Sequence, residues 1–155
     1  MSFAPGGLAV VVGASGGIGA ALVQALQNSA QFVQVLGLSR RSAPALDLLD
    51  EASIANCAQH VQGLQLPLRC VFDATGMLHA GPIQPEKTWQ QLDAAAMAQA
   101  FAINAIGPAL LMKHFLPLLV ALGARADGEA AQRIAADITH SVLSMESYVW
   151  GLPTA

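Results

Sequence analysis

The residues best suited to chemistry are glycines between an apolar run and a helical segment. The β-branched run Leu8–Val12 predicts a buried parallel strand, and the spacing of apolar residues in Ile18–Asn28 predicts a helix. A helix start exposes unpaired N–H groups and the positive end of its dipole, which bind phosphate. Glycine allows a tight turn and a close approach. This segment therefore predicts an anion site at Gly13, Ser15, Gly16, Gly17, Ile18 and Gly19.

The glycine spacing differs from two common phosphate-binding motifs. Ala14 and Ser15 separate Gly13 from the next glycine, so the segment is not a standard G-x-G-x-x-G. It is not a P-loop either, because no Lys-Ser/Thr pair follows Gly19. A tight strand–helix turn that binds no ligand remains the alternative.

The elements around this turn alternate between strand and helix, which predicts an α/β protein with right-handed crossovers and a parallel sheet. A change of composition at residue 123 suggests two parts, a binding domain at 1–122 and a divergent tail at 123–155. Expected strands are Leu8–Val12, Phe32–Leu38, a short Ala45–Leu48, Leu68–Phe72 and one more at Ile138–Leu143; expected helices are Ile18–Asn28, Asp50–Gln62, Thr88–Gln99 and Ala102–Leu122.

Composition excludes some classes of function. The 155 residues carry a net charge of −3 with only seven Lys and Arg, so no basic stripe is available for nucleic acid. No metal-type spacing involves Cys57 or Cys70, which we expect to be reduced, buried thiols. The start of the chain lacks the features of a signal peptide, so a cytoplasmic location is expected.

Apolar residues make up 54% of the chain and charged residues 11%, an unusually apolar balance. Parallel strands buried on both faces account for part of it. Apolar surface that awaits a partner subunit or a missing segment is a compatible explanation. Ala102–Leu122 has the length of a membrane span, but it contains Asn104, Lys113, His114 and two prolines. We therefore interpret it as a buried or interface helix and expect no membrane partner.

Gly13, Gly17 and Gly19 after a first strand resemble the cofactor motif of the short-chain dehydrogenases/reductases. The resemblance covers roughly Leu8–Leu119. It implies a Rossmann-type, doubly wound, three-layer parallel sheet that is incomplete at its C-terminal side, since the family fold needs more chain. It also implies a nicotinamide dinucleotide as the cofactor.

Two further segments match positions that contact the adenosine half in that family. Ser39 and Arg40 follow the second strand, where an acidic residue would favour NAD and a basic one pairs with a 2′-phosphate. The resemblance therefore implies NADP(H) in preference to NAD(H), with a solvated basic loop as the alternative. Asp47 and Leu48 match the residues that contact adenine, although many loops contain Asp-Leu.

The segment Asp73-Ala74-Thr75-Gly76 resembles a variant of the family's Asn-Asn-Ala-Gly motif, with both asparagines replaced. This implies that Ala74, Thr75 and Gly76 lie beside the cofactor. The stretch through His79 is similar to that of the C-factor-like subgroup. His79 has the chemistry of an acid–base group, but a loop histidine without a visible partner is more often uninvolved.

The segment Ile103–Pro108 resembles the part of the family that contributes an active-site asparagine through a helix distortion, which implies that role for Asn104. A core asparagine with satisfied hydrogen bonds is the alternative. The family's serine and Tyr-x-x-x-Lys are not matched. Ser144 and Tyr148 are only four residues apart, Leu152 stands where lysine is needed, and we interpret Tyr148 as a coincidental match.

The resemblance implies hydride transfer with a small-molecule carbonyl or alcohol substrate, and the unmatched Tyr-x-x-x-Lys implies impaired catalysis in this chain. The chain is either a truncated or frameshifted product or a degenerate member that binds without catalysing. Two other classes stay open: a non-catalytic dinucleotide-binding module, and a homo-oligomerising module that uses the helix at 102–122. No metal is expected.

Overall fold

The computed structural model describes residues 5–77 and 86–123. The chain divides into two compact units, Met1–Leu119 and Val120–Ala155, and every described element begins in the first. Strands β1 (Leu8–Val12), β2 (Gln34–Leu38) and β3 (Leu68–Asp73) are accompanied by helices α1 (Gly17–Asn28) and α2 (Glu51–Gly63). A 3-10 turn at Trp89–Gln91 then precedes α3 (Ala94–Phe101), a π-helical turn (Ala102–Ile106) and α4 (Gly107–Gly123).

The described sheet has three parallel strands in the order β2-β1-β3. All five residues of β1 have no solvent-exposed surface, because this strand is central and both of its faces are covered. In the pairing register, Val12 lies beside Leu38 on one side and Asp73 on the other. The carboxyl ends of the three strands therefore meet at one edge of the sheet.

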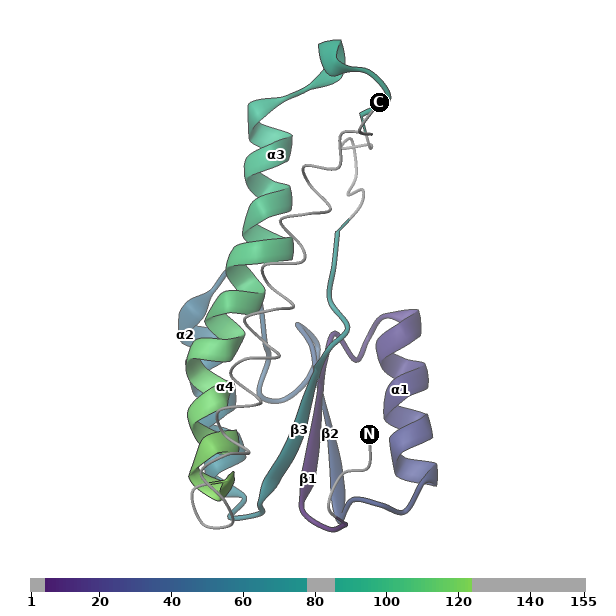
Figure 1. The fold of residues 1–155 in the computed structure, drawn as a ribbon, viewed down its shortest axis with the longest axis vertical. Coiled ribbons are helices and arrows are strands. Elements are labelled where there is room, and N and C mark those ends of the chain that lie inside the picture. Colours follow the sequence, from purple (N-terminus) through teal and green to yellow (C-terminus); the bar gives the residue numbers. More distant parts are fainter. Residues whose placement is uncertain (1–4, 78–85, 124–155) are drawn as a thin grey trace. The chain divides into compact units, whose positions relative to one another are not determined.

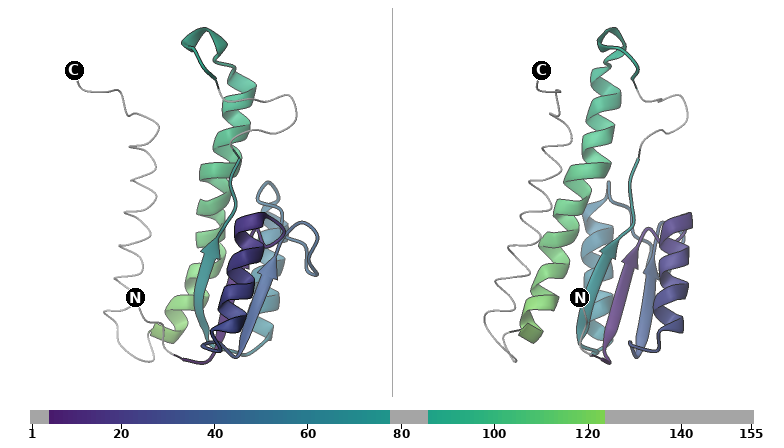
Figure 2. Two further views of the ribbon diagram at one scale, coloured as in Figure 1. Left: turned by 90° about the vertical axis from the view of Figure 1, so that its right-hand side faces the viewer. Right: turned by 45° about the vertical axis from the view of Figure 1, so that its right-hand side comes forward.

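Helices cover the two faces of the sheet in three layers (Figures 1 and 2). Helix α1 lies on one face, and α2 and α4 lie together on the other. On the α1 side, Ala9, Phe32 and Cys70 form a buried cluster to which Leu26 of α1 contributes. The connection β1–α1–β2 runs one way along the sheet and β2–α2–β3 runs the other way, which confirms the doubly wound α/β fold.

Helix α3, the π-helical turn and α4 follow one another without a break. The carboxylate of Asp93 accepts a hydrogen bond from the Ala96 N–H (2.8 Å) and so begins α3. Leu111 and Phe115, four residues apart, are buried on one face of α4. The segment Ala94–Leu119 is long and apolar enough to cross a membrane, by a test that single helices of soluble proteins also pass.

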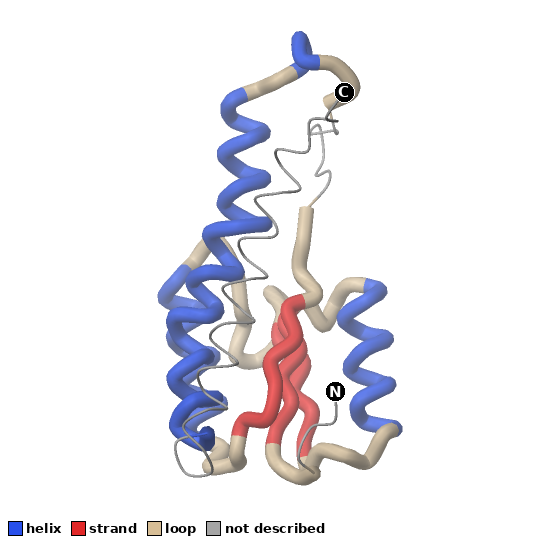
Figure 3. The backbone as a smooth tube through the Cα atoms, viewed as in Figure 1, coloured by secondary structure: helices blue, strands red, loops and turns tan. Residues whose placement is uncertain are grey.

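The strand predicted at Ala45–Leu48 is wrong, because the whole stretch from β2 to α2 is loop (Figure 3). Local hydrogen bonds replace strand pairing. The Ser42 hydroxyl binds the carbonyl oxygens of Ser39 and Pro44 (2.7 Å each), and the Leu46 N–H donates back to the Ser39 carbonyl (2.9 Å). These bonds curl the chain and occupy backbone groups that a neighbouring strand would need.

The helix predicted to start at Thr88 starts at Ala94 instead, since the capping carboxylate is that of Asp93. Several predicted features lie outside the described residues: His79, the strand at Ile138–Leu143, Ser144, Tyr148 and the tail beyond residue 123.

Candidate functional site

A cavity of about 410 Å³ lies at the edge where the strands end. In doubly wound sheets this edge is where ligands bind, at the point where the chain reverses its direction along the sheet. Ten residues predicted from the sequence line the cavity: Gly13, Ser15, Gly16, Ser39, Arg40, Asp47, Leu48, Ala74, Thr75 and Gly76. Six more line it that the sequence did not assign to the site: Val12, Leu46, Leu49, Met77, Gln99 and Ile103.

The glycine turn is fixed by close backbone contacts. Gly13 has a φ of +82°, a conformation that side chains disfavour, and a Cβ there would lie 2.8 Å from the Ala74 carbonyl oxygen. A Cβ on Gly19 would overlap the Gly13 carbonyl oxygen. The Gly13 and Ala14 N–H groups both donate to the Leu38 carbonyl (2.9 and 3.1 Å), so the turn is attached to the end of β2.

Helix α1 begins in a way that leaves its positive end available. Gly16 occupies the N-cap and supplies no side-chain bond, and the first turn contains no acidic residue. A Cβ on Gly17 would meet no protein atom within 4 Å, so the space in front of the helix start is open. These features fit a phosphate group. Gly17, Ile18 and Gly19 belong to this helix start but do not line the cavity itself, and the Ile18 side chain is 79% exposed.

The basic pair after β2 stands at the rim of the cavity. The Ser39 hydroxyl accepts a hydrogen bond from the Arg41 N–H (3.1 Å), which holds this turn in place. Arg40 lines the cavity and is exposed, and its guanidinium forms no hydrogen bond or ion pair with the described residues. Its five N–H donors are therefore available to an anion.

Asp47 and Leu48 form a turn that also lines the cavity. The Asp47 carboxylate accepts a hydrogen bond from the Leu49 N–H (3.0 Å), and the Ser53 hydroxyl binds the Asp47 N–H and carbonyl (2.9 and 3.0 Å). The Leu48 side chain is buried. A Cβ on Gly107 would lie 2.8 Å from that of Leu48, so the long helix passes directly behind this turn.

The turn after β3 is held by the carboxylate of Asp73, which stands where the family motif has an asparagine. Asp73 Oδ1 accepts hydrogen bonds from the backbone N–H (2.9 Å) and the hydroxyl of Thr75. The Ala74 N–H donates to the Val12 carbonyl (2.9 Å), which continues the sheet pattern for one more residue. Both hydrogen bonds go to one carboxylate oxygen of Asp73, which acts only as an acceptor. An aspartate can therefore hold Thr75 in place without an amide group.

Asn104 lies in the π-helical turn, so the helix distortion expected at this position is present. Its Oδ1 accepts a hydrogen bond from the Met77 N–H, and its amide group donates to the Met77 carbonyl, both at 2.7 Å. The side chain thus joins the helix to the segment after β3. Its amide is satisfied by the protein, and it does not line the cavity. An active-site role for Asn104 stays a prediction.

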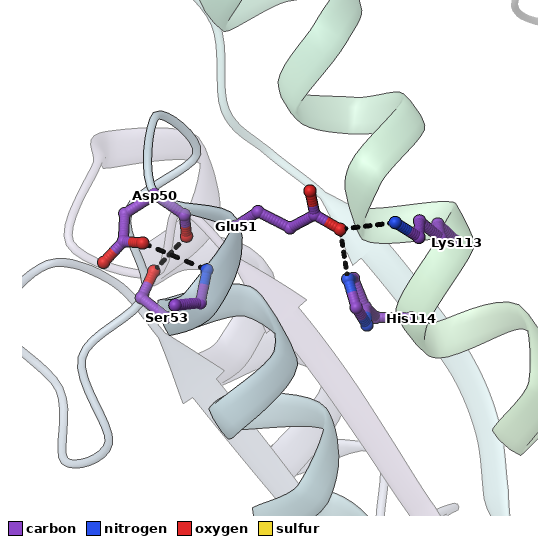
Figure 4. Close-up of polar contacts among 6 residues, drawn as sticks. Asp50, Glu51, Ser53, Lys113 and His114 are labelled. Atoms are coloured by element: carbon purple, nitrogen blue, oxygen red, sulfur yellow. Dashed lines mark hydrogen bonds and ion pairs between the residues drawn. The ribbon is translucent and has the colours of Figure 1, made fainter.

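A polar cluster joins α4 to the start of α2 (Figure 4). Glu51 Oε1 accepts hydrogen bonds from Lys113 Nζ (2.6 Å) and His114 Nε2 (2.9 Å). The bonds from Lys113 and then His114 lower the pKa of Glu51 below its usual value. Beside it, Asp50 caps α2 by accepting from the Ala52 N–H (3.0 Å). This cluster fixes the long helix near the loop that borders the cavity.

Metal-site geometry is not found among the described residues, where no three His, Cys, Asp or Glu side chains cluster. Cys57 and Cys70 are free, buried thiols. Burial raises the pKa of Cys57, and it raises that of Cys70 to about 11. Neither thiol is therefore a good nucleophile or metal ligand.

Several solved structures that share this arrangement are named as dehydrogenases or reductases. An NADPH-bound carbonyl reductase from chicken fatty liver matches 74% of this chain with 24% identity and a TM-score of 0.62. Thermoplasma acidophilum aldohexose dehydrogenase matches 77% with 15% identity and a TM-score of 0.62. A short-chain dehydrogenase/reductase of Serratia marcescens matches 71% with 19% identity and a TM-score of 0.57. The chain has the short-chain dehydrogenase/reductase fold.

The chain spans about half the length of these proteins, with 52%, 48% and 51% of them covered. No protein-family model matches the sequence, and a search of curated proteins finds no match. The likeness is therefore one of fold. The three-layer arrangement expected from the glycine motif is confirmed, and the C-factor-like subgroup is not.

Proposed function

We propose that the cavity binds the adenosine half of NADP(H). The observation that carries this proposal is the convergence of three features on one strand edge: the open start of α1, the Arg40 guanidinium, which has no partner among the described residues, and the apolar lining residues Leu46, Leu48 and Ile103. A dinucleotide carries a pyrophosphate, a ribose phosphate and a flat base, which match these features in turn. A volume near 410 Å³ is within the usual range for a ligand site.

Each part of the site has a role in this proposal. The start of α1 at Gly16–Gly19 faces the pyrophosphate with backbone N–H groups. Arg40 pairs with the 2′-phosphate, assisted by Ser39, and so favours NADP(H) over NAD(H). Asp47 and Leu48 border the base, while Ala74, Thr75 and Gly76 lie along the inner ribose.

We further propose that the activity of the whole protein is hydride transfer with a small carbonyl or alcohol. NADPH would supply the hydride to a carbonyl, or NADP⁺ would accept it from an alcohol, and the chain's own residues would bind and orient the cofactor. The carbonyl reductase from chicken fatty liver, bound to NADPH, supports this class. Tyr-x-x-x-Lys is absent from the sequence, so we propose that this chain binds the cofactor with little or no turnover. A cytoplasmic location without nucleic-acid or membrane partners belongs to the same proposal.

Fluorescence titration with NADPH tests the binding proposal. We expect a Kd between micromolar and millimolar, and a loss of about 10- to 100-fold in Arg40→Asp, because a charge-assisted bond is removed. NADH binding should not fall in that variant. Arg41→Asp is the matched control, since Arg41 does not line the cavity. Equal losses in both variants would remove Arg40 from the site, and robust turnover on a panel of aldehydes and ketones would refute impaired catalysis.

A second candidate function is homo-oligomerisation through the helix around 102–122. The observation that favours it is exposed apolar surface at the start of this helix and just before it, where Ile106 is 55% and Phe101, the last residue of α3, 47% exposed. Ile106→Lys should then shift the sedimentation coefficient to that of a monomer. Val33→Lys, at an exposed residue elsewhere (70%), should leave it unchanged.

A further inference from the structure

Gln99 lies on the face of the long helix that borders the cavity. Gly107 passes directly behind Leu48, and Ile103 and Gln99 both line the cavity. Gln99 belongs to α3, and Ile103 belongs to the π-helical turn that follows it. The cavity lining itself, and not a regular helical spacing, places both residues at the site.

The Gln99 amide is available to a ligand. It is exposed, and no hydrogen bond joins it to the described residues. Asn104, five residues further on, makes the contrast clear, because both ends of its amide are bonded to Met77. A primary amide offers two donors and an acceptor in one plane. Such a group recognises a partner that presents a donor and an acceptor side by side.

The apolar part of the cavity lining suits a flat aromatic group. It includes Leu46, Leu48 and Ile103, and Leu46 and Leu48 are buried. Asp47 also lines the cavity, and its Oδ1 already accepts from the Leu49 N–H. A carboxylate only accepts, so it is unable to satisfy a ring nitrogen that needs a donor. Gln99 supplies that donor.

We infer that Gln99 recognises the polar edge of the adenine ring, with its carbonyl oxygen accepting from the exocyclic amino group and its NH₂ donating to the adjacent ring nitrogen. Glutamine pairs with adenine in this bidentate way in other recognition sites. The inference rests on the proposed binding of NADP(H). The inference assigns the selection of the base to Gln99, whereas the residues named above bind the phosphates.

The test compares NADP⁺ with its 1,N6-ethenoadenine analogue, which keeps all phosphates but has no exocyclic N–H to donate. The wild-type chain should bind the analogue about tenfold more weakly than NADP⁺, as expected for the loss of this hydrogen bond. Gln99→Leu should bind both ligands about equally, at the affinity of the wild type for the analogue. Gln62→Leu, at an exposed glutamine of α2, should keep the wild-type ratio.

The outcomes separate the two proposals. If NADP⁺ binds the wild type but Gln99→Leu keeps the wild-type ratio, the role of Gln99 is overturned while the proposed function stands. A preference that is lost equally in Gln62→Leu also overturns it. If NADP⁺ fails to bind the wild type, the proposed function fails and this inference with it. Circular dichroism of each variant establishes that the fold is retained.

Discussion

The two walls of the cavity are held in place by different means. The wall formed by β1 and α1 depends on backbone geometry, with Gly13 and Gly19 packed against carbonyl oxygens. The wall formed by the long helix depends on side chains, through Asn104 to Met77 and Glu51 to Lys113 and His114. The first wall should therefore tolerate no added atoms at Gly13 and Gly19, whereas the second should weaken by degrees as single contacts are removed.

The largest effect is expected at Gly19. In Gly19→Ala the new methyl group overlaps the Gly13 carbonyl oxygen, and the turn must move. We expect a loss of about 3 kcal/mol or more in the free energy of unfolding, together with loss of NADPH binding. Gly17→Ala is the matched control, because its methyl group meets open space. It should keep wild-type stability in urea unfolding yet bind NADPH more weakly. Equal stability of the two variants would contradict this account of the turn.

Thiol labelling should reveal which wall opens when the ligand leaves. Cys57 Sγ lies 3.4 Å from the Ala45 carbonyl, next to the cavity loop, whereas Cys70 lies in the core on the α1 side. Ligand at about 100 times its Kd should slow labelling of Cys57 by up to about 100-fold, if the opening that exposes it also releases the ligand.

Single-thiol variants, Cys57→Ala and Cys70→Ala, allow each rate to be followed separately with a thiol reagent. The ligand should slow the labelling of Cys70 by a smaller factor than the labelling of Cys57. The two factors become similar only where Cys70 is labelled through global unfolding. If the ligand slowed the labelling of Cys70 more than that of Cys57, the motion that releases the ligand would lie on the α1 side of the sheet. This result would contradict the prediction.

Removal of the Asn104 side chain should have an intermediate effect. Asn104→Ala deletes two hydrogen bonds and leaves the backbone groups of Met77 without these partners. We expect a loss of about 2 kcal/mol in the free energy of unfolding, measured in urea. Asn104→Asp keeps an acceptor for the Met77 N–H but has no donor for its carbonyl, so its loss should differ from that of the alanine variant. Wild-type stability of Asn104→Ala would show that this brace is dispensable.

The smallest effect is expected at Glu51 and should depend on pH. Hydrogen bonds from Lys113 and His114 lower its pKa below the usual 4.5, so the ionised form stabilises the fold. This contribution is present above the unfolded-state pKa and is lost as the pH falls through the lower folded-state value. The Tm of Glu51→Gln should thus be slightly below that of the wild type at about pH 7 and equal to it at about pH 2.

Glu86→Gln is a suitable control, because Glu86 is exposed and forms no ion pair within the described part of the chain. Its Tm should match the wild type at both pH values. A difference for Glu51→Gln that persists unchanged in acid would exclude the ion-pair explanation.

The strands and the glycine turn could be predicted because their signals are local. The run Leu8–Val12 is apolar throughout and forms β1 with those bounds, and the predicted Leu68–Phe72 differs from β3 by one residue. The failed strand at Ala45–Leu48 has an apolar pattern too, but the Ser42 hydroxyl captures the backbone around it. Such competition between side-chain and strand hydrogen bonds is not visible in hydropathy.

The helix wall of the cavity was harder to predict. The position of Asn104 in a distorted helix followed from a family resemblance, yet its bonds to Met77 did not. Gln99 and Ile103 could not be assigned to the cavity from their four-residue spacing, because that spacing marks one face only of a regular α-helix. The π-helical turn at Ala102–Ile106 contains Ile103, and its effect on which face meets the cavity is not visible in hydropathy.

The π-helical turn at Ala102–Ile106 separates the length of the helix from its rotation. One residue of an α-helix advances the chain by about 100° around the axis, so a deletion in a regular helix rotates one half against the other. A π-helical turn holds one extra residue in a widened turn. Loss of a single codon within it would thus restore a regular helix and leave the faces of the flanking segments where they are, whereas the same loss within α3 or α4 would rotate part of the helix away from its contacts.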